Sequence, residues 1–131
     1  MTDTRPAVLC LDDSATVHAC MAAQLEPQMS YRGVRTWTEA LSSIRHGAPD
    51  VILVDLDMEG FRGEDVLGFL DRCRSFIART RVLVFSAHSE EEIRSRVAGL
   101  RIDGILPKTF DPTMMVKLRQ ALTVSRRTPS A

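Results

Sequence analysis

The feature that most constrains the fold of this chain is a regular alternation of short apolar runs with segments of helical spacing. The apolar runs lie at residues 7–11, 51–54, 82–85 and 102–106, and residues 31–34 are expected to form one more strand. Four or five consecutive apolar residues are typical of strands that are buried on both faces, as in a parallel sheet. The alternation therefore predicts an α/β domain with five βα units and right-handed crossovers.

Local signals place a helix after each predicted strand. Ser14, Ser89 and Asp111 stand where helix N-caps are expected, Gly47 stands at a C-cap, and Pro27 ends the first helical segment. The buried helix faces are expected to be formed by Val17, Met21 and Leu25, by Leu41 and Ile44, by Val66, Leu67, Leu70, Cys73 and Ile77, by Ile93, Val97 and Leu100, and by Met115, Leu118 and Leu122.

Composition excludes several classes of function. The chain has 131 residues, the size of one domain, and its 17 basic and 17 acidic residues cancel, which argues against direct nucleic-acid binding and against binding to anionic membranes. No apolar run approaches the ~20 residues that cross a bilayer, and no signal-peptide core is present, so a cytoplasmic location is expected. Cys10, Cys20 and Cys73 form no CxxC pair, which favours buried reduced thiols over a metal or redox site.

Polar side chains follow four of the predicted strands. Asp12 and Asp13 follow the first, Asp55 the third, Ser86 the fourth and Lys108 the fifth. A turn cap explains any one of them, but a parallel sheet gathers them all at its carboxyl edge. Crowded carboxylates favour a hard divalent cation such as Mg²⁺, and an ammonium and a hydroxyl suit phosphoryl oxygens. The pattern predicts a phosphoryl-binding site in which a carboxylate nucleophile forms an acyl phosphate.

The order and spacing of these motifs resemble the receiver domain of two-component response regulators. The resemblance rests on LDDS at residues 11–14, VILVDLDM at residues 51–58 with Gly63 eight residues past Asp55, VFSA at residues 84–87 and LPK at residues 106–108, and it covers residues 6–124. It implies a three-layer flavodoxin-like (βα)₅ sandwich whose parallel strands run in the order 2-1-3-4-5, with helices on both faces. A single domain over residues 1–125 and a polar tail or linker over residues 126–131 are expected.

The resemblance also implies roles for the acidic residues. Asp55 is expected to accept a phosphoryl group from a phosphohistidine on a sensor histidine kinase or phosphotransfer protein. The chain is thus expected to be a signalling domain rather than a turnover enzyme. Asp13 is expected to bind Mg²⁺ directly together with Asp55, Asp12 through water, and Asp57 through its backbone carbonyl. Asp57 and His88, which stands two residues beyond the family's serine, are candidates for tuning the rate of dephosphorylation.

The family's switch residues are partly altered in this chain. Ser86 and Lys108 are expected to hold the phosphoryl oxygens. The fourth helix, fifth strand and fifth helix are expected to form the surface that passes on the signal, through contacts with another protein or through a phosphorylation-dependent homodimer. Ile105 stands where an aromatic switch residue is usual, and Thr109 replaces a proline that follows a cis peptide bond.

Two alternatives stay open at this point. A pseudo-receiver would act as a phosphorylation-independent interaction module, an interpretation that the changes at Ile105 and Thr109 favour. The Asp55-Leu-Asp57 motif also resembles that of haloacid-dehalogenase-type phosphatases, although in that family the motif comes near the start and the second acidic pair follows the lysine. The arginines Arg94, Arg96 and Arg101 are a further candidate, as a recognition face beside the acidic start of the fourth helix.

Overall fold

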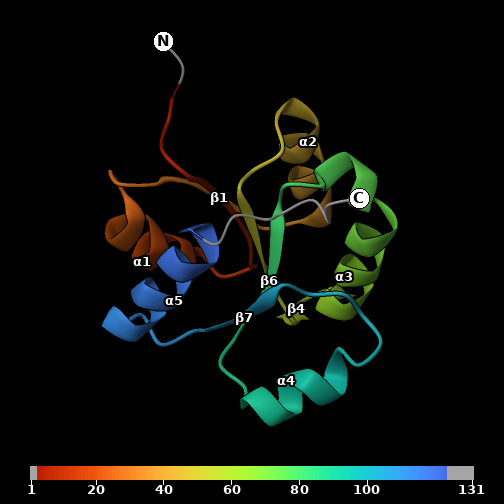
Figure 1. Ribbon diagram of the computed structural model, residues 1–131. Helices are drawn as coiled ribbons and strands as arrows, with labels where there is room; N and C mark the ends of the chain where they lie inside the picture. The colour runs from red at the N-terminus through yellow and green to blue at the C-terminus, as the bar shows by residue number, and fades with distance from the viewer. Residues whose placement is uncertain (1–2, 124–131) are drawn as a thin grey trace.

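The computed structural model describes residues 3–123, in which strands and helices alternate along the chain (Figure 1). The elements are β1 (Ala7–Leu11), α1 (Ala15–Leu25), β2 (Ser30–Val34), α2 (Trp37–His46), β3 (Val51–Asp55), β4 (Asp57–Met58), β5 (Phe61–Arg62), α3 (Gly63–Arg72), the 3₁₀ helix η1 (Arg74–Ile77), β6 (Arg81–Ser86), α4 (Glu90–Arg96), β7 (Gly104–Pro107) and α5 (Pro112–Thr123). The five predicted strands and five predicted helices are confirmed.

Five strands form one parallel sheet in the order β2-β1-β3-β6-β7. Counted along the chain without the short pair β4–β5, this is the order 2-1-3-4-5, so the flavodoxin-like fold is confirmed. The register places Leu11 beside Val54, Asp55 beside Phe85 and Ser86 beside Pro107. The carboxyl ends of β1, β3, β6 and β7 therefore meet at one edge.

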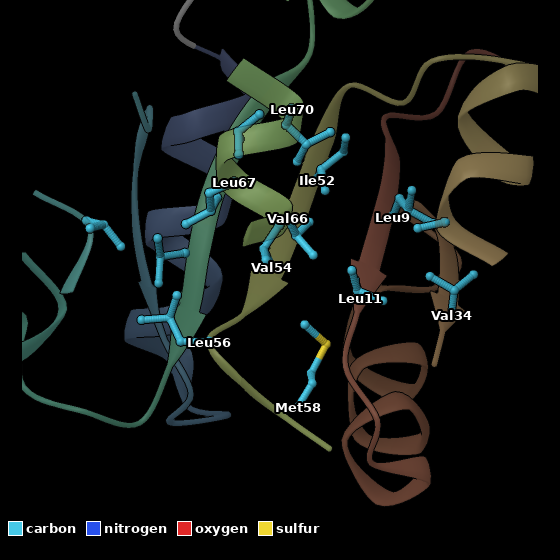
Figure 2. Close-up of a cluster of buried hydrophobic side chains, with 14 of the residues drawn as sticks. Leu9, Leu11, Val34, Ile52, Val54, Leu56, Met58, Val66, Leu67 and Leu70 are labelled. Carbon is cyan, nitrogen blue, oxygen red and sulfur yellow. The ribbon is translucent and has the colours of Figure 1, made fainter. Parts of the chain in front are cut away.

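Helices cover both faces of the sheet and give the molecule two apolar cores. On one face, alternate strand residues such as Leu9 and Ile52 pack with α2, α3 and α4, and Figure 2 shows the side chains of α3 facing those of β3. On the other face, Val8 and Cys10 belong to the core that α1 and α5 cover. Burial on both faces explains why the central strands read as continuous apolar runs.

Predicted helix faces differ in detail from the structure, as α3 and α5 show. The α3 helix ends at Arg72, and Ile77 is buried from the following 3₁₀ helix, where the amide of Phe76 donates to the carbonyl of Cys73. The tighter 3₁₀ turn redirects the chain toward β6. In α5, Met114 is buried and Met115 only half-buried. The helical spacing from Leu118 fits either methionine, so the sequence pattern alone does not decide which one is buried.

A short antiparallel pair that the sequence analysis did not predict follows the third strand. Asp57 pairs with Arg62 and Met58 with Phe61, so β4 and β5 form a two-residue hairpin between β3 and α3. Elements of two residues carry no periodicity that a sequence pattern can report. The hairpin matters for the site because it begins at Asp57, whose backbone amide donates to Oδ1 of Asp55.

The expectations from composition have mixed outcomes. Within residues 3–123, no helix combines the length and the apolar character needed to cross a bilayer. All three cysteines are free thiols, but only Cys10 is buried, whereas Cys20 and Cys73 are half-buried. The expected tail at residues 126–131 lies outside the described residues.

Candidate functional site

Three carboxylates meet at the carboxyl edge of the sheet. Asp12 directly follows β1, Asp13 follows it, and Asp55 is the last residue of the neighbouring strand β3. Each offers one oxygen that lies within 4.8 Å of those of the other two. Asp12 is 1% exposed and Asp55 5% exposed, so water screens their mutual repulsion only weakly.

Lys108 supplies the positive charge of this cluster. Its Nζ lies 2.6 Å from Oδ2 of Asp12 and 3.1 Å from Oδ1 of Asp55. Burial alone would lower the pKa of Lys108, but its hydrogen bond to Asp12 and the charge of Asp55 raise the pKa above its usual value. The backbone amide of Lys108 donates to the carbonyl of Ser86 at 3.0 Å, so the end of β6 fixes the position of the lysine backbone.

The environment of Asp55 disfavours its charge. Burial raises its pKa above the usual value, although the positive charge of Lys108 and the hydrogen bond from the backbone amide of Asp57 act against this rise. That amide donates to Oδ1 of Asp55 at 3.2 Å. The carboxylate is thus held by two donors, and a further cation beside it would favour its ionised form.

Ser86 ends β6, one register position beyond the residue that pairs with Asp55. It is 2% exposed, and its hydroxyl accepts a hydrogen bond of 3.0 Å from the backbone amide of His88. Because that bond uses a lone pair of Oγ, the hydroxyl proton is left to donate to an acceptor at the sheet edge.

Gly63 permits the backbone behind Asp55 to pass close to α3. A Cβ atom at this position would lie 2.4 Å from the carbonyl oxygen of Asp55 and 2.6 Å from Cα of Leu56. The amide of Gly63 also donates to the carbonyl of Leu56 at 3.2 Å. Only glycine fits this approach without displacing the backbone of the Asp55 loop.

The sequence-predicted cluster is therefore brought together by the fold, and comparison with known proteins identifies its family. The family model described as the response regulator receiver domain matches residues 8–120. The chain belongs to this family. Among curated proteins, no sequence match was found.

Solved structures agree with the receiver fold. The Vibrio cholerae chemotaxis protein CheY4 has a TM-score of 0.78 and 22% identity, covering 91% of this chain and 99% of that one. A response regulator from Thermotoga maritima has a TM-score of 0.74 and 20% identity, with coverages of 90% and 98%. The signal receiver domain of an HD domain-containing protein from Pseudomonas fluorescens Pf-5 has a TM-score of 0.76 and 19% identity, with coverages of 93% and 90%.

Beside the receiver's acidic cluster, Asp57 and His88 contact each other. Nε2 of His88 lies 2.5 Å from Oδ2 of Asp57, and both side chains are exposed. The sequence analysis assigned both residues to this region. The structure places the side chain of Asp57 in this pair and leaves only its backbone as a candidate for metal binding.

Sequence analysis missed the role of Arg96 in this receiver. Its guanidinium contacts Oδ1 of Asp57 at 2.8 Å, Glu64 at 3.0 Å and the carbonyl of Leu56 at 3.3 Å. The hydrogen bond from Arg96 is the main cause that lowers the pKa of Asp57. The expected recognition face is therefore wrong for Arg96, because its side chain is turned toward the β3–α3 loop. Sequence spacing could not indicate this contact, because Arg96 and Asp57 are 39 positions apart.

The two altered switch positions have ordinary structural roles. Ile105 is half-buried and packs against the core that α2, α3 and α4 cover. Among the described residues, the one cis peptide bond joins Glu26 to Pro27, so the turn at Thr109 is built differently, as predicted. There the hydroxyl of Thr109 donates to Oδ1 of Asp111 at 2.6 Å, next to the start of α5.

Proposed function

We propose that this receiver domain accepts a phosphoryl group on Asp55 from a phosphohistidine of a sensor histidine kinase or phosphotransfer protein. The observation that carries the proposal is the meeting of Asp12, Asp13 and Asp55, with Lys108 between two of them, at the carboxyl edge of the sheet. This cleft combines a nucleophile with a cation for phosphoryl oxygens. The proposal places the domain in the cytoplasm, in two-component signalling.

The hydrogen bonds of Asp55 indicate which oxygen attacks. Oδ1 already contacts Nζ of Lys108 and the amide of Asp57, whereas Oδ2 has no such partner among residues 3–123. Oδ2 attacks phosphorus as the bond between phosphorus and the histidine nitrogen breaks, and the electrons of that bond return to the imidazole. An ionised carboxylate has no proton to lose, so the step needs no general base.

The donor set of the cleft fits Mg²⁺. Three carboxylates face one ammonium, and hard oxygen ligands of this kind are those that Mg²⁺ prefers. We assign Asp13 and Asp55 as direct ligands, Asp12 as a ligand through water and Asp57 as a ligand through its carbonyl. When bound, the cation neutralises charge on the carboxylates and on the incoming phosphoryl oxygens.

Four residues would act after transfer. The hydroxyl of Ser86 and the ammonium of Lys108 donate hydrogen bonds to the new phosphoryl oxygens. The paired side chains of Asp57 and His88 influence the approach of the water that hydrolyses the acyl phosphate and ends the signal. The change is passed to an effector protein, or to a second phosphorylated copy, through the surface of α4, β7 and α5. The domain promotes only its own phosphorylation and dephosphorylation.

The test is labelling with acetyl phosphate in the presence of Mg²⁺, followed by mass spectrometry. We expect the unsubstituted chain to gain one phosphoryl group and Asp55→Asn to gain none. Asp65→Asn, which changes an exposed carboxylate on α3, is the matched control and should be labelled normally. Labelling of Asp55→Asn at another residue would contradict the proposal.

The pseudo-receiver remains the alternative that Ile105 and Thr109 favour. Beryllofluoride with Mg²⁺ imitates the phosphoryl group, so we expect it to shift amide resonances of α4, β7 and α5. A cleft that takes up neither ion would support the pseudo-receiver. Turnover of small phosphomonoesters would instead favour a phosphatase.

A further inference from the structure

We propose that His18 is a positioning residue that fixes the peptide group joining Asp12 to Asp13, and with it the directions of both carboxylates. The inference rests on the proposed function, because it concerns residues that this function assigns to magnesium binding. His18 lies on α1, outside the acidic cluster, and is half-buried against the strand ends.

Both ring nitrogens of His18 have partners. Nε2 lies 2.7 Å from the carbonyl oxygen of Asp12 and 3.2 Å from that of Val34, and Nδ1 lies 2.6 Å from the hydroxyl of Tyr31. Carbonyl oxygens only accept hydrogen bonds, so Nε2 must carry a proton. In the neutral ring, Nδ1 is then an acceptor, and the hydroxyl of Tyr31 donates to it.

The carbonyl of Asp12 lies where the strand pairing of β1 stops. The amide of Asp12 still donates to the carbonyl of Val34 at 3.1 Å, but the carbonyl of Asp12 lies past the end of β1, where His18 is its partner. Because the peptide group is planar, holding this oxygen limits ψ of Asp12 and φ of Asp13. Those two angles set how both side chains leave the backbone.

The neighbouring strand is shaped around the imidazole. A Cβ atom at Gly33 of β2 would lie 2.3 Å from Nδ1 of His18, so the ring occupies the space that any other residue would need. Burial raises the pKa of Tyr31, so its hydroxyl keeps the proton that it donates to Nδ1. This packing holds the ring in one place, as a residue that orients metal ligands requires.

Two substitutions separate hydrogen bonding from packing. His18→Phe keeps a ring of similar size without a donor, whereas His18→Gln loses the ring and keeps an amide donor near the position of Nε2. We expect calorimetric titration to show Mg²⁺ binding weakened about tenfold in His18→Phe, and within about twofold of normal in His18→Gln. His46→Phe, which changes an exposed histidine that bonds to its own helix, is the control and should bind normally.

A role in packing alone predicts the reverse order, with His18→Gln the weaker variant, and that result would overturn the inference. Normal Mg²⁺ affinity in His18→Phe, or no Mg²⁺ binding by the unsubstituted chain, would overturn it too. If His18→Phe does not fold, ¹⁵N NMR of the imidazole in the unsubstituted chain decides. A proton on Nε2 supports the inference, and a neutral ring protonated on Nδ1 contradicts it.

The proposed function fails by a different measurement. If Asp55 takes no phosphoryl group but Mg²⁺ binding still depends on the donor at residue 18, the positioning role stands without phosphoryl transfer. If Asp55 is labelled normally and His18→Phe binds Mg²⁺ normally, only the positioning role is wrong.

Discussion

Asp55 combines two demands that oppose each other at the level of one side chain. The proposed phosphoryl transfer needs the ionised carboxylate, yet its burial and the neighbouring charge of Asp12 both raise its pKa. Lys108 partly offsets this through contacts with both carboxylates. A further cation in the cleft would therefore favour the ionised form of Asp55, which the proposed function requires.

This conflict predicts a pH-dependent effect of Asp55→Asn on stability. The pKa of Asp55 is higher in the folded than in the unfolded chain, so the folded state binds the proton more readily, and its stability falls as pH rises through the interval between the two values. Without Mg²⁺, we therefore expect Asp55→Asn to unfold at higher urea concentration than the unsubstituted chain at pH 7. The gain should shrink as pH falls toward about 4, the ordinary range of an aspartate.

Asp65→Asn is the control for removing a carboxylate, because its side chain is exposed. It should change the urea midpoint little at either pH. A gain in Asp55→Asn that is equal at pH 7 and at pH 4 would show that the buried charge is not its cause.

At the scale of elements, Arg96 ties the end of α4 to the β3–α3 loop. Its contacts with Asp57 and Glu64 join three separate segments, and the side chain of Glu64 is only 11% exposed. Replacing Arg96 with methionine leaves two acidic groups without this partner. We expect a loss of ~1 kcal/mol in the free energy of unfolding and faster hydrogen exchange in the α4 amides.

Arg94→Met is the matched control for this prediction. Arg94 pairs with Glu90 of the same helix, at 3.0 Å, and both side chains are largely exposed. Its loss should change stability by a few tenths of a kcal/mol at most. Equal hydrogen exchange of α4 in the two variants would mean that Arg96 does not anchor the helix.

The same elements show what the sequence could predict and what it could not. The strands follow from their apolar runs and the helix starts from caps such as Ser89, because both signals lie within a few residues. The choice between Met114 and Met115 depends on the packing of α5, since both satisfy the helical spacing. The contacts of His18 and Arg96 are invisible in the sequence pattern, because their partners come from other elements.

For the whole molecule, the cleft lies where two adjacent inner strands of the sheet end. Asp12 follows β1 and Asp55 ends β3, and the side chains of these strands belong to both apolar cores. A ligand that holds these strand ends together binds the folded chain and has no equivalent site in the unfolded one. Binding at the cleft must then stabilise the entire domain.

Magnesium titration during thermal unfolding tests this coupling. For one site, a ligand at 100 times its dissociation constant adds about 2.7 kcal/mol to the free energy of unfolding. We expect the melting temperature to rise with Mg²⁺ concentration in the unsubstituted chain and in Asp65→Asn. Asp13→Asn should lose most of the rise, because it removes an assigned direct ligand, while its half-buried position lets the fold tolerate the change. An equal rise in Asp13→Asn would place the stabilising ion elsewhere, because an ion bound away from the cleft is indifferent to that carboxylate.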